Sequence, residues 1–218
     1  MRKVRDEGFT LIELLVAMTI GLVVMAGVSM TFRSQQRSHL IQEQVAATQQ
    51  NLRAAMYHME REIRMAGCDP TFGASAQIVN ANANAINFTM DVRGAADGSP
   101  PDGTTTDPDE NITYSLSGSD LIRNGAGNIV AENISALDFV YLRQDGTVLN
   151  PGGGNVLAVD IPNIKSVEIT MVARTARSIK GYIDTVSYEN QHGTEILAPP
   201  NDNFRRICLT TRIKCRNL

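Results

Sequence analysis

The longest apolar run of the chain lies near its N-terminus. Every residue from Phe9 to Phe32 is apolar, small or hydroxyl-bearing except Glu13. A transmembrane helix needs about 20 such residues, whereas the apolar part of a secretory signal has roughly 7 to 15. The pattern therefore predicts a membrane-spanning helix over residues 9–33.

The helical pattern continues past the predicted membrane span. Apolar residues recur at steps of three and four on one face, with charged residues on the others. Neither Pro nor Gly interrupts residues 28–66, Gly67 is placed as a C-terminal cap, and Pro70 forbids continuation. We therefore expect an amphipathic continuation over residues 34–67, in one helix of ~87 Å at 1.5 Å per residue. The positions expected to face the rest of the protein include Leu52, Met56, Met59 and Ile63.

The spacing of apolar residues changes to a period of two over residues 68–218, which predicts a β-rich globular head. Alternation with one polar face is typical of an antiparallel sheet that is covered on one side. The helix is the obvious cover, with Met56, Met59 and Ile63 on the sheet. The expected fold class is α+β, a ladle of one long helix and an antiparallel sheet. The expected strands are 85–92, 112–116, 135–142, 165–174 and 205–215.

Composition excludes one large class of function. The formal net charge is -3, and Lys and Arg are dispersed rather than clustered. Such a chain lacks the basic field that holds phosphate backbones, so no nucleic-acid partner is expected.

The sequence contains no recognisable catalytic or metal-binding motif. The three histidines, His39, His58 and His192, are far apart in the sequence, and no grouping resembles a catalytic triad or a phosphate-binding loop. His58 and Glu62 share a helix face at i, i+4, yet a solvated helix surface is the better interpretation. No enzyme activity, metal or cofactor is expected.

Acidic residues gather in one segment of the predicted head. It holds Asp97, Asp102, Asp107, Asp109 and Glu110 without the spacing of a calcium loop. We expect a solvated, mobile insertion, and calcium binding is the minor alternative.

Three cysteines, Cys68, Cys208 and Cys215, allow at most one internal disulfide. Cys208 and Cys215 could pair only across a turn or bulge, because seven strand residues span ~23 Å. A bond from Cys68 to either one would tie the helix end to the last strand and is slightly favoured for an oxidising compartment. A third possibility is that no disulfide forms and all three cysteines are free thiols.

The stretch "GFTLIELLVAMTIG" resembles the class III signal of type IV prepilins. The resemblance implies a leader over residues 1–8, cleavage after Gly8 by a membrane prepilin peptidase, and N-methylation of Phe9. It also implies that Glu13 is the fifth mature residue and that stem helices polymerise with those of other major and minor pilins. The implied location is the inner membrane, single-pass with the head in the periplasm, and the assembled pilus after processing. An uncleaved signal anchor is the alternative.

A charge argument for Glu13 stands beside this resemblance. A carboxylate at mid-bilayer costs roughly 2.5 to 3.5 kcal/mol on insertion scales. Cleavage after Gly8 would place a new ammonium on Phe9 at a similar depth, and a buried carboxylate is tolerable when paired. We therefore expect Glu13 to pair with the Phe9 ammonium of a neighbouring subunit and to set the register of the stems.

The order of the predicted strands resembles the minor pilins of the PilW type, and the runs that carry this likeness are "NIVAENISALDFVYL", "IKSVEITMVARTAR" and "RRICLTTRIKCRNL". Minor pseudopilins of type II secretion, the GspJ type, share the order loosely. The expected function is that of a minor type IV pilin that takes part in pilus assembly or initiation near the tip. A type II secretion or DNA-uptake pseudopilin is the first alternative, and a membrane-anchored periplasmic binding protein or enzyme is the second.

Overall fold

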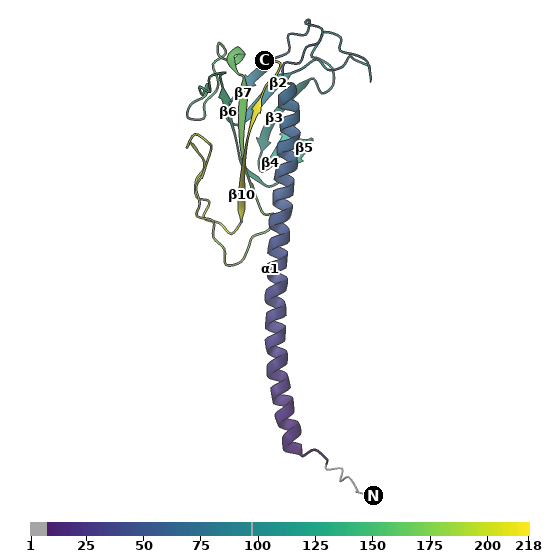
Figure 1. The fold of residues 1–218 in the computed structure, drawn as a ribbon, viewed down its shortest axis with the longest axis vertical. Coiled ribbons are helices and arrows are strands. Elements are labelled where there is room, and N and C mark those ends of the chain that lie inside the picture. The colour runs from purple at the N-terminus through teal and green to yellow at the C-terminus, as the bar shows by residue number, and fades with distance from the viewer. Residues whose placement is uncertain (1–7, 97) are drawn as a thin grey trace. The chain divides into compact units, whose positions relative to one another are not determined.

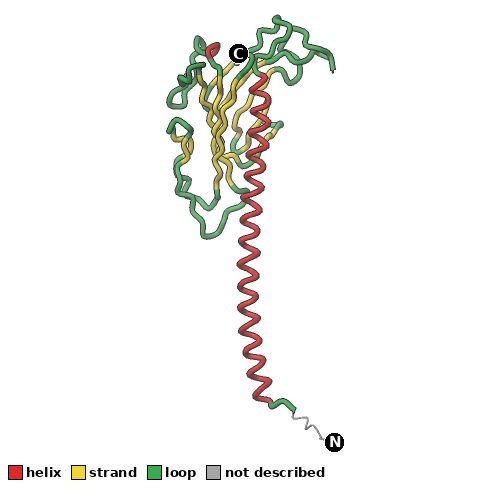
Figure 2. Tube along the Cα trace, viewed as in Figure 1, coloured by secondary structure: helices red, strands yellow, loops and turns green. Residues whose placement is uncertain are grey.

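The computed structural model describes residues 8–96 and 98–218, and the chain divides into two compact units. The first unit ends at Glu43 and holds the first part of helix α1 (Leu11–Met65). The second unit begins at Gln44 and holds the rest of α1 with all the strands. Figure 2 shows the helix in red and the strands in yellow.

Helix α1 is a single 55-residue helix that ends where the sequence predicts. Gly67 follows it with φ of 77°, a left-handed conformation that favours glycine, and its N–H donates to the carbonyl of Thr89. A Cβ on Gly67 would lie 2.4 Å from the side chain of Leu218. The backbone conformation therefore favours glycine here, and a larger residue would also displace the side chain of Leu218.

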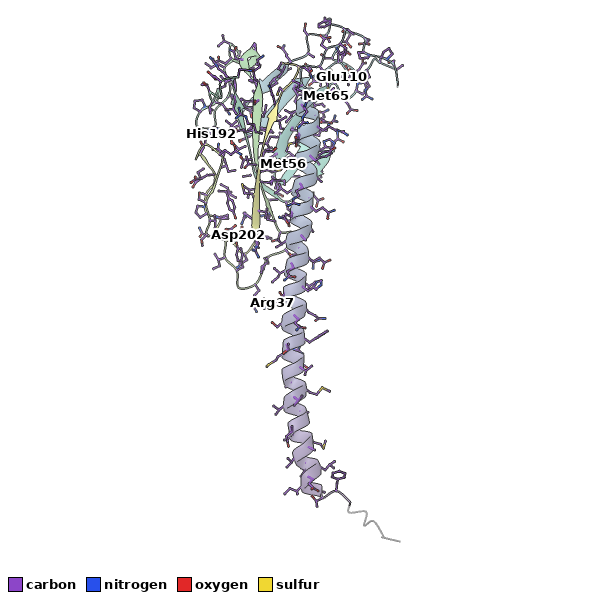
Figure 3. The ribbon with its side chains drawn as sticks, viewed as in Figure 1. Arg37, Met56, Met65, Glu110, His192 and Asp202 are labelled. Atoms are coloured by element: carbon purple, nitrogen blue, oxygen red, sulfur yellow. The ribbon has the colours of Figure 1, made fainter. Side chains whose placement is uncertain are left out.

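Within the second unit, one face of α1 is buried against the head. Met56, Met59 and Ile63 are all buried, which confirms the predicted packing face (Figure 3 labels Met56). They belong to one hydrophobic cluster with strand residues such as Phe88 and Phe139. The i, i+3, i+4 spacing of these residues explains why a single helix face can complete the core.

The first sheet has five antiparallel strands in the order β1-β2-β3-β4-β5. Its strands are β1 (Ile78–Ala81), β2 (Ala85–Thr89), β3 (Asn111–Ser117), β4 (Asp120–Arg123) and β5 (Ile129–Ala131). Ile86, Phe88, Ile112 and Tyr114 are fully buried, in agreement with the predicted alternation. The strand predicted over residues 85–92 ends at Thr89, because the N–H of Asp91 turns to the carbonyl of Cys68.

The second sheet has three antiparallel strands in the order β10-β7-β6, drawn in yellow and green in Figure 1. They are β6 (Ile134–Leu142), β7 (Ser166–Arg174) and β10 (Arg206–Lys214), and the short helix η1 (Ile161–Asn163) precedes β7. Two further strands, β8 (Tyr188–Glu189) and β9 (Glu195–Leu197), form a separate hairpin.

The expectation of one sheet with one polar, solvated face is wrong for this second sheet. Both faces of β6 and β7 are buried, and Val172 is as inaccessible as Met171. The chain around the β8-β9 hairpin covers the second face. Asn190 donates to Asp138 at 2.9 Å, and His192 Nε2 lies 2.8 Å from Glu168 Oε2. Polar residues on this face thus bind a covering segment instead of water.

Candidate assembly site

The start of helix α1 holds Glu13 in a local hydrogen-bonded arrangement with Thr10. The backbone N–H and the hydroxyl of Thr10 both donate to Glu13 Oε2, at 2.9 and 2.7 Å. The N–H of Glu13 in turn donates to Thr10 Oγ1 at 3.3 Å. This is a capping box, which satisfies helix donors that have no partner within the helix. The Thr-x-x-Glu spacing was visible in the sequence and the prediction overlooked it.

The residues predicted to be processed lie immediately before this box. Gly8 and Phe9 precede the helix, and Phe9 is 93% exposed. The predicted leader covers residues 1–8, of which 1–7 lie outside the described part of the chain. The structure thus places Phe9 next to the cap formed by Thr10 and Glu13.

The first part of α1 is apolar, and its side chains are exposed. By length and composition it can cross a membrane, and none of its most apolar stretch is buried within the chain. Leu14, Ile20 and Met25 are examples of large side chains that are more than half exposed. Such a surface needs lipid or other apolar helices around it, because large exposed apolar patches are rare on soluble proteins.

The pair His58 and Glu62 is not the solvated helix surface that the sequence suggests. Glu62 is buried, and it accepts hydrogen bonds from the Tyr114 hydroxyl at 2.5 Å and from Arg123 Nε at 3.0 Å. His58 Nδ1 lies 2.7 Å from the same hydroxyl. Burial, followed by the bond to Glu62, raises the pKa of Tyr114 far above its ordinary value. The cluster fastens α1 to the first sheet.

The acidic segment is more ordered than predicted. Glu110 is fully buried, and its Oε1 accepts from the N–H groups of Val92 and Arg93. Asp109 bonds Arg123 at 2.7 Å, and this guanidinium, helped by Arg93, holds the pKa of Asp109 below its usual range. Glu110 therefore belongs to the buried framework of the head, whereas the Asp109 side chain bonds Arg123 while it stays exposed to solvent.

Metal binding gains no support from the structure. Asp97 lies outside the described residues, and Asp102 is exposed. Within residues 8–96 and 98–218, no group of three His, Cys, Asp or Glu side chains is arranged to hold a metal ion. The three histidines lie in separate places, with His39 exposed in the first unit.

The three cysteines are free thiols in the structure. Strand β10 is continuous, so Cys208 is exposed on one face while Cys215 is buried on the other, as the two-residue period requires. A bond between these two is therefore excluded by the strand. Cys68 follows Gly67, against which Leu218 packs, so the helix end and the C-terminal segment are neighbours. The slightly favoured bond from Cys68 is absent in this structure.

Comparisons with known proteins agree with this arrangement. Residues 3–29 match the family described as "Prokaryotic N-terminal methylation motif". Among solved structures, a type IV-like pilin from Thermus thermophilus is similar, with a TM-score of 0.54 and 16% sequence identity. The match covers 78% of this chain and 95% of that one. A comparison with curated proteins gave no match.

The class of fold follows from the helix, the sheets and this likeness. One long N-terminal helix with an antiparallel β-rich head is the α+β fold of type IV pilin-like proteins. The matched residues 3–29 include the start of α1, and the apolar stretch of this helix is long enough to cross a membrane.

Proposed function

We propose that the protein is a structural subunit of a type IV pilus, a minor pilin that takes part in assembly or initiation near the pilus tip. The single observation that carries the proposal is the coincidence of two features in one chain. A methylation motif spans residues 3–29, and the same chain has a pilin-like fold. The minor, tip-associated role rests on the resemblance of the head to the PilW type.

The proposed processing creates the charge that Glu13 needs. A prepilin peptidase removes the leader, residues 1–8, after Gly8, and Phe9 becomes the N-methylated terminus. Residues 9–33 anchor the chain in the inner membrane, residues 34–67 continue the helix into the periplasm, and residues 68–218 form the head. Other major and minor pilins are the partners, and they pack along the stem helix.

The capping box suggests how Glu13 can bind Thr10 of its own chain and the Phe9 ammonium of a neighbouring subunit at the same time. Both bonds from Thr10 end on Oε2, which fixes the carboxylate close to the helix N-terminus. Oε1 is then oriented for the Phe9 ammonium of a neighbouring subunit. In an apolar medium a paired carboxylate is far less costly than an isolated one. A stem displaced by one helical turn would lose this pair, so the pair sets register.

Replacement of Glu13 tests the proposal. Glu13→Val should abolish incorporation into pili while leaving membrane insertion unchanged, because a more apolar stem still inserts. Glu43→Val is the matched control, since it removes a carboxylate from the same helix outside the membrane-spanning part. Pili are sheared from cells and probed for the protein, and membranes are probed in parallel. Wild-type incorporation of Glu13→Val would refute the proposed role.

A further inference from the structure

Strand β10 forms one edge of the three-stranded sheet and pairs with β7 over nine residues without a bulge. The N–H of Cys215 donates to the carbonyl of Lys165 at 3.0 Å. This bond shows which alternate residues of β10 have their backbone groups directed towards β7. Because bonded pairs alternate along antiparallel strands, the backbone groups of Cys208, Thr210 and Arg212 point away from β7. Within the described part of the chain, no hydrogen bond reaches these outward backbone groups.

The opposite edge of the same sheet is closed. The outward N–H of Phe139 in β6 donates to the carbonyl of Ala83 at 2.8 Å. The carbonyl of Tyr141 accepts from the N–H of Leu149, also at 2.8 Å. Among residues 8–96 and 98–218, the chain therefore covers one edge of this sheet and leaves the other open along β10.

The open edge also has an incomplete apolar layer. Ile207 and Leu209 face the core and pack against it, yet both are only partly buried. Their partners across the ladder, Ala173 and Met171, are completely buried. The run from Ile207 to Thr211 contains no charge, Pro or Gly, the devices that normally protect an edge strand. One more strand beside β10 would complete both the hydrogen bonds and the apolar cover.

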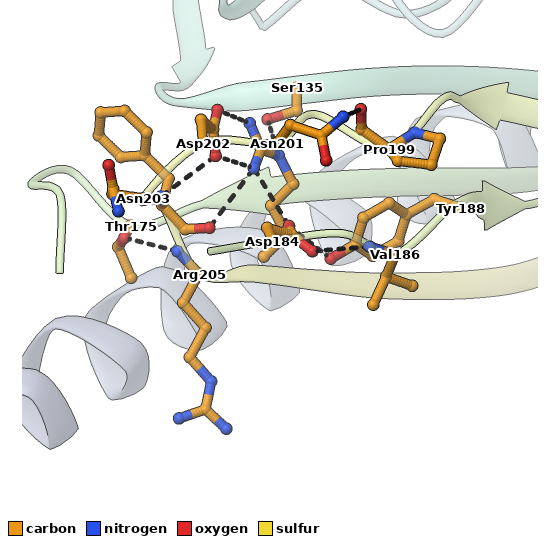
Figure 4. Close-up of polar contacts among 12 residues, drawn as sticks. Ser135, Thr175, Asp184, Val186, Tyr188, Pro199, Asn201, Asp202, Asn203 and Arg205 are labelled. Atoms are coloured by element: carbon orange, nitrogen blue, oxygen red, sulfur yellow. Dashed lines mark hydrogen bonds and ion pairs between the residues drawn. The ribbon is translucent and has the colours of Figure 1, made fainter. Parts of the chain in front are cut away.

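The two ends of β10 differ in charge. At its start, Arg206 donates to Asp202, at 2.6 and 2.7 Å, and to Asp184 at 3.1 Å (Figure 4 labels the two aspartates). The charge of Arg206 is therefore already engaged within the chain.

At its other end, β10 borders a hollow of about 340 Å³ lined by three cations, Lys165, Arg212 and Lys214, together with Gln144 and Ser166. The acid that approaches this group is Glu168, 3.9 Å from Arg212 Nε. Glu168 is already engaged by His192 at 2.8 Å. The hollow therefore carries an excess of positive charge and fits a carboxylate.

We infer that the edge of β10 is a docking site for an extended segment of a partner protein, added as a fourth strand with a carboxylate in the hollow beside Arg212 and Lys214. Backbone bonds to Cys208, Thr210 and Arg212 supply affinity, as in other cases of strand addition. Side chains over Ile207 and Leu209 are apolar, and the acidic end fixes the direction of the added strand. This inference concerns the head and does not depend on the proposed role of Glu13.

The test uses the full chain in detergent and a synthetic peptide of alternating Val and Thr with two Glu residues at one end. Hydrogen exchange should show new protection of β10 amides when the peptide is added. Thr210→Pro removes one outward N–H, which an edge strand tolerates, and should weaken peptide binding at least about tenfold. Thr210→Val, which keeps the N–H, is the matched control and should bind like the wild type.

A second peptide, with Lys in place of both Glu residues, keeps the test valid if Thr210→Pro fails to fold. It should bind the wild-type protein about tenfold more weakly than the acidic peptide. Equal binding of the two peptides, or no added protection of β10, would overturn the inference. Self-association of the wild-type protein that Thr210→Pro abolishes would overturn it too, because the occupant would then be a second copy.

Discussion

At the scale of single residues, the head depends on a few buried charges. Glu62 on α1 bonds Tyr114 and Arg123 on two strands of the first sheet, and Asp109 shares the same guanidinium. A buried ion pair adds little by itself, but removal of one partner leaves the other charge buried and unpaired. Such residues hold the helix to the sheet in one orientation.

Glu62→Gln should therefore destabilise the head. We expect a loss of about 3 kcal/mol, because Arg123 keeps only a half-exposed partner in Asp109. Thermal unfolding should shift downward by roughly 6 to 12 °C. Glu60→Gln is the control on the same helix, since the Glu60–Arg64 pair is at the surface. Equal shifts for the two variants would show that the buried cluster contributes nothing special.

The thiols of the reduced protein should react in the order of their exposure. Burial raises the pKa of Cys215 to about 12, whereas Cys208 is exposed. A maleimide at pH 7.5 should label Cys208 first and Cys215 only after unfolding, as peptide mass mapping can show. Because the folded pKa of Cys215 exceeds its ordinary value of 9.0, its contribution to stability is present below pH 9 and is lost as the pH rises towards 12. Rapid labelling of Cys215 in the folded protein would contradict this burial.

At the scale of elements, the sequence predicts the helix better than the sheets. The spacing of apolar residues, with Gly67 and Pro70 as helix-ending residues, predicted the bounds of α1 to within a few residues. These signals depend only on neighbouring residues in the sequence. Strand β10 was also predicted closely. The short strands β1, β4, β5, β8 and β9 were missed, because two to four residues give too little alternation to detect. The second buried face of β6 and β7 depends on a distant segment around His192, which no local pattern reveals.

The residues of the candidate site also differ in whether a local sequence pattern could predict them. Gly8, Phe9 and Glu13 came from a dense local motif, and Thr10 was detectable by its spacing to Glu13. The burial of Glu62 could not be predicted, because it depends on Arg123 in a separate strand.

The buried face of α1 gives a prediction at this scale. Met59 is completely buried, so Met59→Ala should cost about 2 to 5 kcal/mol through lost burial and a cavity. Tyr57, two residues away on the same helix, is 69% exposed, and Tyr57→Ala should change stability by less than about 0.5 kcal/mol. Denaturant unfolding of both variants measures the difference. A larger effect for Tyr57→Ala would mean that another face of the helix packs on the head.

At the scale of the whole molecule, the two units differ in how their apolar side chains are covered. The head, from Gln44 onward, completes its own core with one face of α1. The first part of α1 leaves its apolar side chains uncovered and begins with a carboxylate in a capping box. In the proposed function, lipid first covers this surface and neighbouring stems cover it later, once processing has supplied the ammonium at Phe9.

The most direct test of this account is the intact mass of the protein recovered from assembled pili. The account predicts a chain that lacks residues 1–8, begins at Phe9 and carries one added methyl group. An unprocessed chain that still begins at Met1, recovered from functional pili, would contradict it, because Glu13 would then have no amine from a neighbouring Phe9.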